Sequence, residues 1–290
     1  MRERASERSF CGVVRLLRFT LDTMPAMRSA LVAALALPDG ILGCRSATPA
    51  GPTVVRLIAT DYGFTVPGEV PAGLVTLRLV NQGQSWHEAL VVALAEGATV
   101  ESYRAAAQDG ADYPPGALDL GGPGIVAPGD SSEVLLQLAP GRHAVICWVD
   151  NHVRAGMIAP LQATAGSGPT AAPPSPDIEL ALTEFQFAFS RSLGRGPQVV
   201  HITNSGARTH DASIYRLAEG KTVAHFGAWL RDRQGPPPAV PVGGLTSMAP
   251  AHEAWARLSL SAGRYFIACG EPEGDKIHAQ LGMLLEFTVP

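Results

Sequence analysis

Two sets of cysteine, histidine and methionine have the clearest capacity for chemistry in this sequence. The first set places Cys147, His152 and Met157 in a C-x4-H-x4-M spacing, with His87 sixty residues before the cysteine. Two imidazoles, one thiolate and a weak axial thioether form the ligand set of a blue-copper electron-transfer site. The set suits copper because soft sulfur favours Cu(I) and imidazole accommodates Cu(II). The second set repeats these residue types in the same order: His210, Cys269, His278 and Met283.

The spacing predicts that one hairpin presents three of these ligands. The cysteine ends one strand, the downstream histidine lies in the connecting loop, and the methionine opens the last strand. The upstream histidine closes the site from a neighbouring strand. Taken singly, each residue type is more often structural than metal-binding. Because all four types occur in order and twice, we expect copper in at least one half of the chain, with a metal-free fold left open as the alternative.

An internal repeat separates the two sets. A shift of 123 positions aligns the segment 81–87 with the segment 204–210, and both read Asn-x-Gly-x-x-x-His. A shift of 122 aligns Cys147 with Cys269. Such matches indicate a duplicated domain of about 110 residues. The connecting stretch contains only Ala, Gly, Ser, Thr and Pro, which is typical of a linker. The expected boundaries are a domain at 53–164, a linker at 165–176 and a domain at 177–290.

Within each copy, apolar and polar residues alternate with the period of a β-strand. Residues 75–79 and 253–260 show this alternation, and Pro-Gly pairs interrupt such runs at short intervals. Only 99–108 and 222–233 have a helical pattern. The 31 glycines and 24 prolines are typical of a turn-rich β protein. The sequence therefore predicts an all-β chain with two tandem Greek-key β-sandwiches, each with one short helical excursion.

The ligand order and the strand leading into the cysteine resemble the plastocyanin and azurin family of cupredoxins. The resemblance covers both copies and implies one copper ion at each set of four ligands. It also implies that the downstream histidines, His152 and His278, lie near the surface where a redox partner docks. Two features depart from the family pattern. Family members place Asn directly after the first ligand histidine, where this sequence has Glu88 and Asp211. The C-x8-H loop of the second copy is longer than in most members, which makes its site the less regular one.

The first 44 residues have the features of an export signal. Arg28 precedes an eight-residue apolar run, 30–37, which fits the core of a signal peptide and is too short to span a membrane. The run Ile-Leu-Gly-Cys at 41–44 resembles a bacterial lipobox, so Cys44 is the predicted lipidation site. Cleavage without lipidation is the alternative. We expect a leader over 1–44, a linker over 45–52, and an exported protein that is periplasmic or at the cell surface.

Charge and motif content narrow the expected function. The net charge of −4 and the pI near 6.1 give no basic field for nucleic acid. The predicted membrane contact is through a lipid at Cys44 alone. No histidine flanks Cys147 or Cys269, and the sequence has no His-x-His pair, whereas cupredoxin-based oxidases and nitrite reductases use both. The sequence thus predicts an electron carrier with no catalytic residues that serves an unidentified redox partner protein. A copper carrier or store is the alternative left open.

Overall fold

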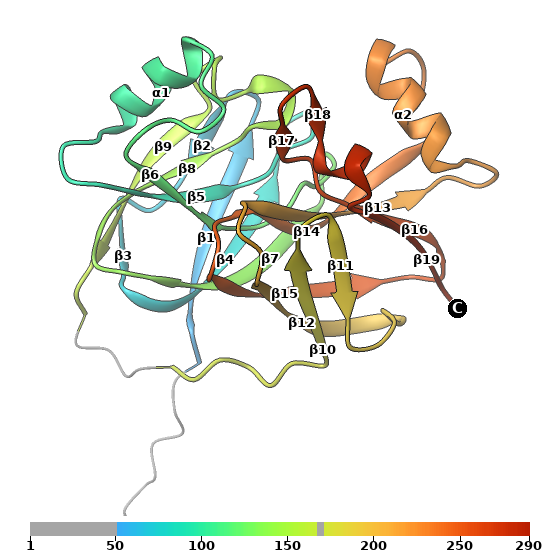
Figure 1. The fold of residues 1–290 in the computed structure, drawn as a ribbon. Helices are drawn as coiled ribbons and strands as arrows, with labels where there is room; N and C mark the ends of the chain where they lie inside the picture. The colour runs from blue at the N-terminus through green and yellow to red at the C-terminus, as the bar shows by residue number, and fades with distance from the viewer. Residues whose placement is uncertain (1–50, 167–170) are drawn as a thin grey trace, which may run out of the picture. The chain divides into compact units, whose positions relative to one another are not determined.

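The computed structural model of the chain describes residues 51–166 and 171–290. The predicted leader and Cys44 lie outside the described residues. Figure 1 shows a β-rich fold with two α-helices, and the predicted all-β class is confirmed. The strands between 53 and 164, here called the first half, are β1 (Thr53–Thr60), β2 (Gly63–Thr65), β3 (Glu69–Pro71), β4 (Gly73–Asn81), β5 (Leu90–Leu94), β6 (Ala117–Gly121), β7 (Ser131–Leu138), β8 (Gly141–Ile146) and β9 (Ile158–Thr164).

The second half, 177–290, contains the remaining ten strands. They are β10 (Ile178–Thr183), β11 (Gln186–Phe189), β12 (Gly196–Asn204), β13 (His210–Leu217), β14 (Ala239–Met248), β15 (Glu253–Leu260), β16 (Gly263–Ala268), β17 (Pro272–Glu273), β18 (Lys276–Ile277) and β19 (Leu284–Val289). The helices are α1 (Val100–Gln108) in the first half, α2 (Val223–Asp232) in the second, and two short 3₁₀ helices at Val149–Asn151 and His278–Leu281.

Both halves use the same strand order. In the first half the two sheets are ordered β2-β1-β4-β7 and β6-β5-β8-β9-β3, of which the short edge strand β3 has no counterpart in the second half. In the second half the corresponding orders are β11-β10-β12-β15 and β14-β13-β16-β19. The parallel pair β1 and β4, with Thr53 opposite Val75, recurs as β10 and β12, with Ile178 opposite Val200. The sheet pattern of a β-sandwich, which the alternation of residues predicts for each copy, is therefore present and repeated.

The two halves share both sheets. Strand β15 pairs with β7, with Trp255 opposite Leu135, and β14 meets β6 where Met248 lies opposite Leu120. One eight-stranded and one nine-stranded sheet each run through both halves as a result. The division of the chain into two domains at 165–176 stays a prediction.

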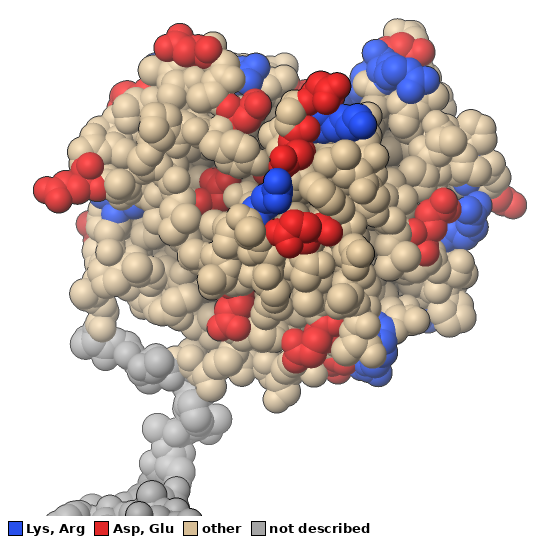
Figure 2. Space-filling view, in the orientation of Figure 1, with Lys and Arg blue, Asp and Glu red and all other residues tan. Residues whose placement is uncertain are grey.

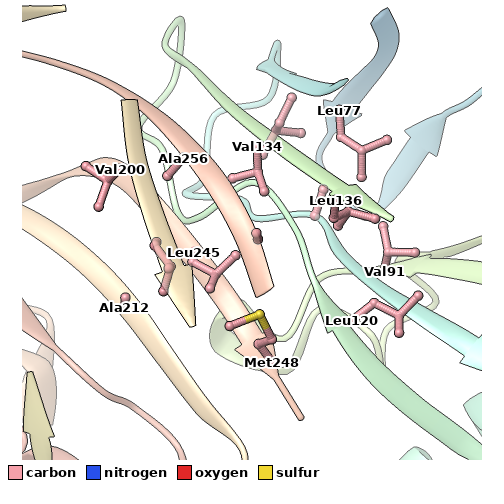
Figure 3. Close-up of a cluster of buried hydrophobic side chains, with 14 of the residues drawn as sticks. Leu77, Val91, Leu120, Val134, Leu136, Val200, Ala212, Leu245, Met248 and Ala256 are labelled. Carbon is pink, nitrogen blue, oxygen red and sulfur yellow. The ribbon is translucent and has the colours of Figure 1, made fainter. Parts of the chain in front are cut away.

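One buried apolar cluster also spans the halves (Figure 3). Leu77 and Val134 of the first half belong to the same cluster as Leu245 and Met248 of the second, and all four are fully buried. Burying one such side chain contributes about 1.5–3 kcal/mol. The cluster therefore stabilises the association of the halves as well as each half.

Both predicted helical excursions are confirmed, and their caps explain where they begin. Thr99 precedes α1, its Oγ1 accepts a hydrogen bond from Ser102 N at 3.1 Å, and Ser102 Oγ accepts one from Thr99 N at 2.9 Å. The same reciprocal cap forms between Thr222 and His225 at the start of α2. Such boxes satisfy backbone N–H groups that have no partner within the helix.

The outer face of β15 departs from simple alternation. The pattern predicts that Trp255 faces solvent together with Glu253 and Arg257, and these two residues are exposed. Trp255 is only 7% exposed because the His201 ring stacks on it at 4.6 Å. His201 is held in turn by Glu179 and Glu253, at 2.7 and 2.9 Å.

Charged side chains are spread over the face shown in Figure 2. Several acidic and basic side chains lie directly beside one another there. Within the part of the chain that the structure describes, neither helix is long and apolar enough to cross a membrane.

Candidate metal centres

The first set of predicted ligands converges inside the first half. His87 lies shortly before β5, Cys147 follows β8 directly, and His152 follows the 3₁₀ helix Val149–Asn151. The Nδ1 atoms of His87 and His152 lie 3.7 and 3.5 Å from Sγ of Cys147. All three donor atoms lie within 4.8 Å of one another. His87 and Cys147 are fully buried and His152 is 5% exposed, so the three groups can hold an ion away from water.

Backbone hydrogen bonds fold the C-x4-H-x4-M segment into a closed loop. Val153 N donates to Cys147 O at 2.8 Å, and Met157 N donates to His152 O at 2.9 Å. Cys147 N donates to Met157 O at 3.2 Å, which places the fully buried methionine residue beside the cysteine. Strands β8 and β9 are antiparallel neighbours, so one hairpin carries three of the predicted ligands.

The second set converges in the same way in the second half. The Nδ1 atoms of His210 and His278 lie 3.9 and 3.4 Å from Sγ of Cys269, and 3.0 Å from each other. Cys269 N donates to the carbonyl of Met283 at 3.0 Å, as in the first site. These residues are all buried. Each half thus contains one Cys/His/His group with a buried methionine next to it in the fold.

The longer loop of the second site does not displace its ligands. The extra residues form a small hairpin of β17 and β18, in which Pro272 lies opposite Ile277. His278 N donates to Glu271 O at 2.9 Å across the base of this hairpin. His278 is 1% exposed and His152 is 5% exposed, so both side chains are buried.

Carboxylates take over the position where the family has Asn. Glu88 Oε1 accepts a hydrogen bond from Trp148 N at 3.0 Å, and Asp211 Oδ1 accepts one from Gly270 N at 2.8 Å. Each bond ties the residue after the cysteine to the residue after the upstream histidine. Asp211 N also donates to Sγ of Cys269 at 3.3 Å. The departure noted in the sequence therefore keeps a link between the two ligand segments.

The Asn-x-Gly motif shapes the turn before the upstream histidine, as the sequence predicts. Asn81 Oδ1 accepts from Gly83 N at 2.9 Å, and its Nδ2 donates to Ser85 O and Val126 O at 2.8 and 3.1 Å. Asn204 makes the corresponding bonds with Gly206, Arg208 and Met248, at 3.0, 2.8 and 2.7 Å.

A carboxylate behind His87 and the matching carboxylate near His210, whose Nε2 makes no hydrogen bond, were missed in the sequence. Asp61 Oδ1 lies 3.3 Å from Nε2 of His87 and accepts from Gln84 N at 2.9 Å. Glu184 accepts a hydrogen bond from Ala207 N at the corresponding place in the second half. A carboxylate on the far nitrogen of a metal-binding histidine fixes its ring and tautomer. The 123-residue shift aligns Asp61 with Glu184, so the repeat contained a signal for this pair.

The glycine of the motif is required by this carboxylate and the histidine. A Cβ on Gly83 would lie 2.5 Å from Oδ1 of Asp61 and 2.8 Å from Nε2 of His87. A Cβ on Gly206 would lie 2.8 Å from Oε1 of Glu184. Any side chain at these positions would push the histidine or its carboxylate away.

Burial shifts the pKa values of the cysteine thiols and of histidine side chains in both sites. It raises the pKa of the Cys147 and Cys269 thiols, and it lowers the pKa of His87 and brings that of His210 to about 4. The pKa of His152 is also lowered by burial. Near neutral pH the histidines with lowered pKa values offer free lone pairs, and a metal must displace a proton from each thiol. Convergent thiol and imidazole donors of this kind fit copper.

No protein-family model and no curated protein sequence matches this chain. Solved structures do. Auracyanin B is 25% identical over 41% of this chain and 93% of its own, with a TM-score of 0.30. Auracyanin A, a "blue" copper protein from Chloroflexus aurantiacus, is 20% identical over 39% of this chain and all of its own, also with a TM-score of 0.30. These neighbours are cupredoxins.

The prediction that the chain is not an enzyme is wrong in the light of two further matches. A multicopper oxidase and a Cu-containing nitrite reductase from Thermus scotoductus each match over 82% of this chain, at 12% identity and a TM-score of 0.24. The matched portion covers 88% and 61% of those chains, and both proteins are enzymes. The prediction rested on missing His-x-His pairs and on the residues that flank each cysteine. Those motifs describe one arrangement of a second copper centre, so their absence does not exclude catalysis.

Proposed function

We propose that this chain is a redox copper protein with one copper site in each half. The observation that carries the proposal is the duplicated, buried group of one thiol and two imidazoles, whose Nδ1 atoms all face the sulfur. The proposed ligands are His87, Cys147, His152 and Met157 in the first half, and His210, Cys269, His278 and Met283 in the second. Copper bound at such a site supplies one-electron chemistry.

The residues around each site hold the ligands in place and exclude water. The closed loop from Cys147 to Met157 fixes three ligand positions, and Asp61 orients His87 from behind. The three donor atoms are buried and face one another, so the site would hold copper in fixed, dry surroundings. Such a rigid, dry site favours fast electron exchange over metal delivery, for which ligands must open.

A partner would reach the first site over Tyr62. This side chain is 57% exposed, and its ring packs edge-on against the His152 ring at 5.3 Å. Weak redox complexes use small interfaces of this kind. We propose an unidentified redox protein as the partner and an exported location for the chain, anchored by lipid at Cys44 or released by cleavage.

Copper titration of the full chain tests the proposal. We expect the reduced protein to bind two equivalents of Cu(II) with intense thiolate-to-copper absorption, and Cys147→Ser or Cys269→Ser to remove about half of it. Circular dichroism confirms that each variant folds. Colourless copper binding would favour a carrier or store. A folded protein that binds no copper would leave a metal-free fold and refute the proposal.

A further inference from the structure

A cavity of about 540 Å³ opens beside Cys269, between α2 and strands β13 and β16. Its walls are mainly apolar and include Phe226, Leu230, Phe266 and Ile277. Its volume lies within the range of about 300–1,000 Å³ typical of small-molecule sites. No described side chain occupies it.

In the first half the corresponding space is filled. Trp148 follows Cys147 and packs against a buried cluster that includes Tyr103, Ile146 and Val153. The rings of Trp148 and Tyr103 are 6.5 Å apart. The indole therefore lies between α1 and the strand that leads into the first cysteine.

The repeat maps that cluster onto the lining of the cavity. Tyr103 is the fifth residue from Thr99, the cap of α1, and Phe226 holds the same place after Thr222 in α2. Trp148 and Gly270 are equivalent because their N–H groups make the same bond, to Glu88 and to Asp211 respectively. The first-half cluster positions Leu90, Ile146, Trp148 and Val153 become the smaller residues Ser213, Ala268, Gly270 and Ala279, all of which line the cavity.

We propose that this cavity binds a small, neutral, planar aromatic molecule with one N–H or O–H donor. Aromatic walls from Phe226 and Phe266 suit such a ring, and the first half shows that a ring fits between the helix and the strand. Polar side chains in the lining can receive the donor, among them Asp211 and Gln280. A Cβ on Gly270 would lie 3.5 Å from Oδ2 of Asp211, to which Ser213 Oγ donates at 3.3 Å. The occupant would touch Cys269, yet its binding does not depend on copper.

Indole binding to the metal-free, reduced full chain tests this inference. We expect one equivalent with a Kd on the order of 0.1 mM, measured by calorimetry and by ligand-observed NMR. Gly270→Trp restores the first-half residue and should weaken binding by about tenfold or more. Val54→Trp is the matched control, because it adds the same side chain at an exposed first-half position outside the cavity, and it should bind indole as the wild type does. Trp148→Gly should add a second equivalent.

Two results would overturn the inference. One is a wild-type chain that shows no saturable indole binding at several times the expected Kd. The other is a folded Gly270→Trp variant that binds indole as tightly as the wild type. Neither result bears on copper binding, because the measurement is made without metal.

Discussion

Corresponding residues in the two halves show what each ligand needs from its surroundings. Glu88 and Asp211 differ in length, yet both accept the N–H of the residue after the cysteine. Asp61 and Glu184 likewise both accept backbone N–H groups at the turn before the upstream histidine. Two side chains of different length in the same role indicate that the acceptor oxygen, rather than the exact residue, is what the site requires.

Substitution of Gly83 tests how closely Asp61 and His87 approach this position. We expect Gly83→Ala to lower the free energy of unfolding by about 1–3 kcal/mol, because its Cβ would overlap Asp61 and His87. Urea denaturation of the metal-free chain measures the change. Gly68→Ala is the control, since no atom lies within 4 Å of its Cβ. Equal stability of the two variants would show that the glycine is not needed for close approach.

The buried Asp119 should make the free energy of unfolding depend on pH, and this residue is not one of the proposed copper ligands. Burial, with a smaller contribution from Glu271, raises its pKa from 3.8 to about 7. The folded chain therefore holds this proton more tightly than the unfolded chain, so the stabilisation is complete below pH 3.8 and is lost as the pH rises through about 7. Asp119→Asn does not titrate. Its stability relative to the wild type should increase between pH 5 and 8 by on the order of 2 kcal/mol, measured by urea denaturation. A pH-independent difference would contradict the shift.

For single residues, the sequence predicted which cysteines and histidines come together but not which neighbouring side chains contact them. Three of the four predicted ligands in each half lie on one hairpin, and the fourth lies at or shortly before the start of a neighbouring strand. The strand pattern of the sequence was therefore enough to predict their positions. The contacts of Asp61 with His87 and of Tyr62 with His152 depend on the turn after β1 folding over the site. Such contacts join distant segments and leave no local pattern, and only the alignment of Asp61 with Glu184 in the repeat points to one of them.

At the scale of elements, the β17–β18 hairpin is an addition to a complete loop. Its strands pair only with each other among the described strands, and the contact between His278 and Glu271 closes its base. We expect deletion of residues 273–276 to preserve copper binding at the second site and to change the free energy of unfolding by less than about 1 kcal/mol. The deletion removes the exposed ion pair of Arg208 with Glu273 and the 3.6 Å contact of Glu273 with Nε2 of His278. Exposed pairs of this kind contribute little.

Copper stoichiometry of the deletion variant measures this directly. Two equivalents per chain would show that the C-x4-H spacing suffices in both halves. A folded variant with one equivalent would show that the hairpin positions His278. The sequence could not predict the hairpin, because the spacing of eight residues between Cys269 and His278 does not show whether this segment pairs with itself or extends across the site. The helices were predictable because Thr99 and Thr222 mark their starts.

At the scale of the whole molecule, the shared sheets make the halves interdependent. Strand β7 would be a sheet edge in an isolated first half, and Leu136 and Leu120 would lose neighbours from the second half. This pairing could not be predicted from the repeat, because the pattern of each copy is the same whether its edge is free or paired. The composition of 165–176 indicates a linker but does not show whether the parts it joins separate.

Cutting the linker tests this interdependence. We expect a chain with a protease site inserted in 165–176 to elute as one particle after cleavage, at micromolar concentration, because β7–β15 pairing and the common apolar cluster hold the halves together. Size-exclusion chromatography followed by electrophoresis measures the result. Separate elution of two folded halves would show that the shared sheets contribute little to the association.

The central claim is that each half holds one copper that takes one electron. A spectroelectrochemical titration of the copper-loaded full chain tests it most directly, with visible absorption followed as the potential is lowered and raised. We predict reversible bleaching with two electrons per chain, and one electron in either Cys147→Ser or Cys269→Ser. Absorption that cannot be reversibly bleached, or two electrons retained by a folded cysteine variant, would contradict the claim.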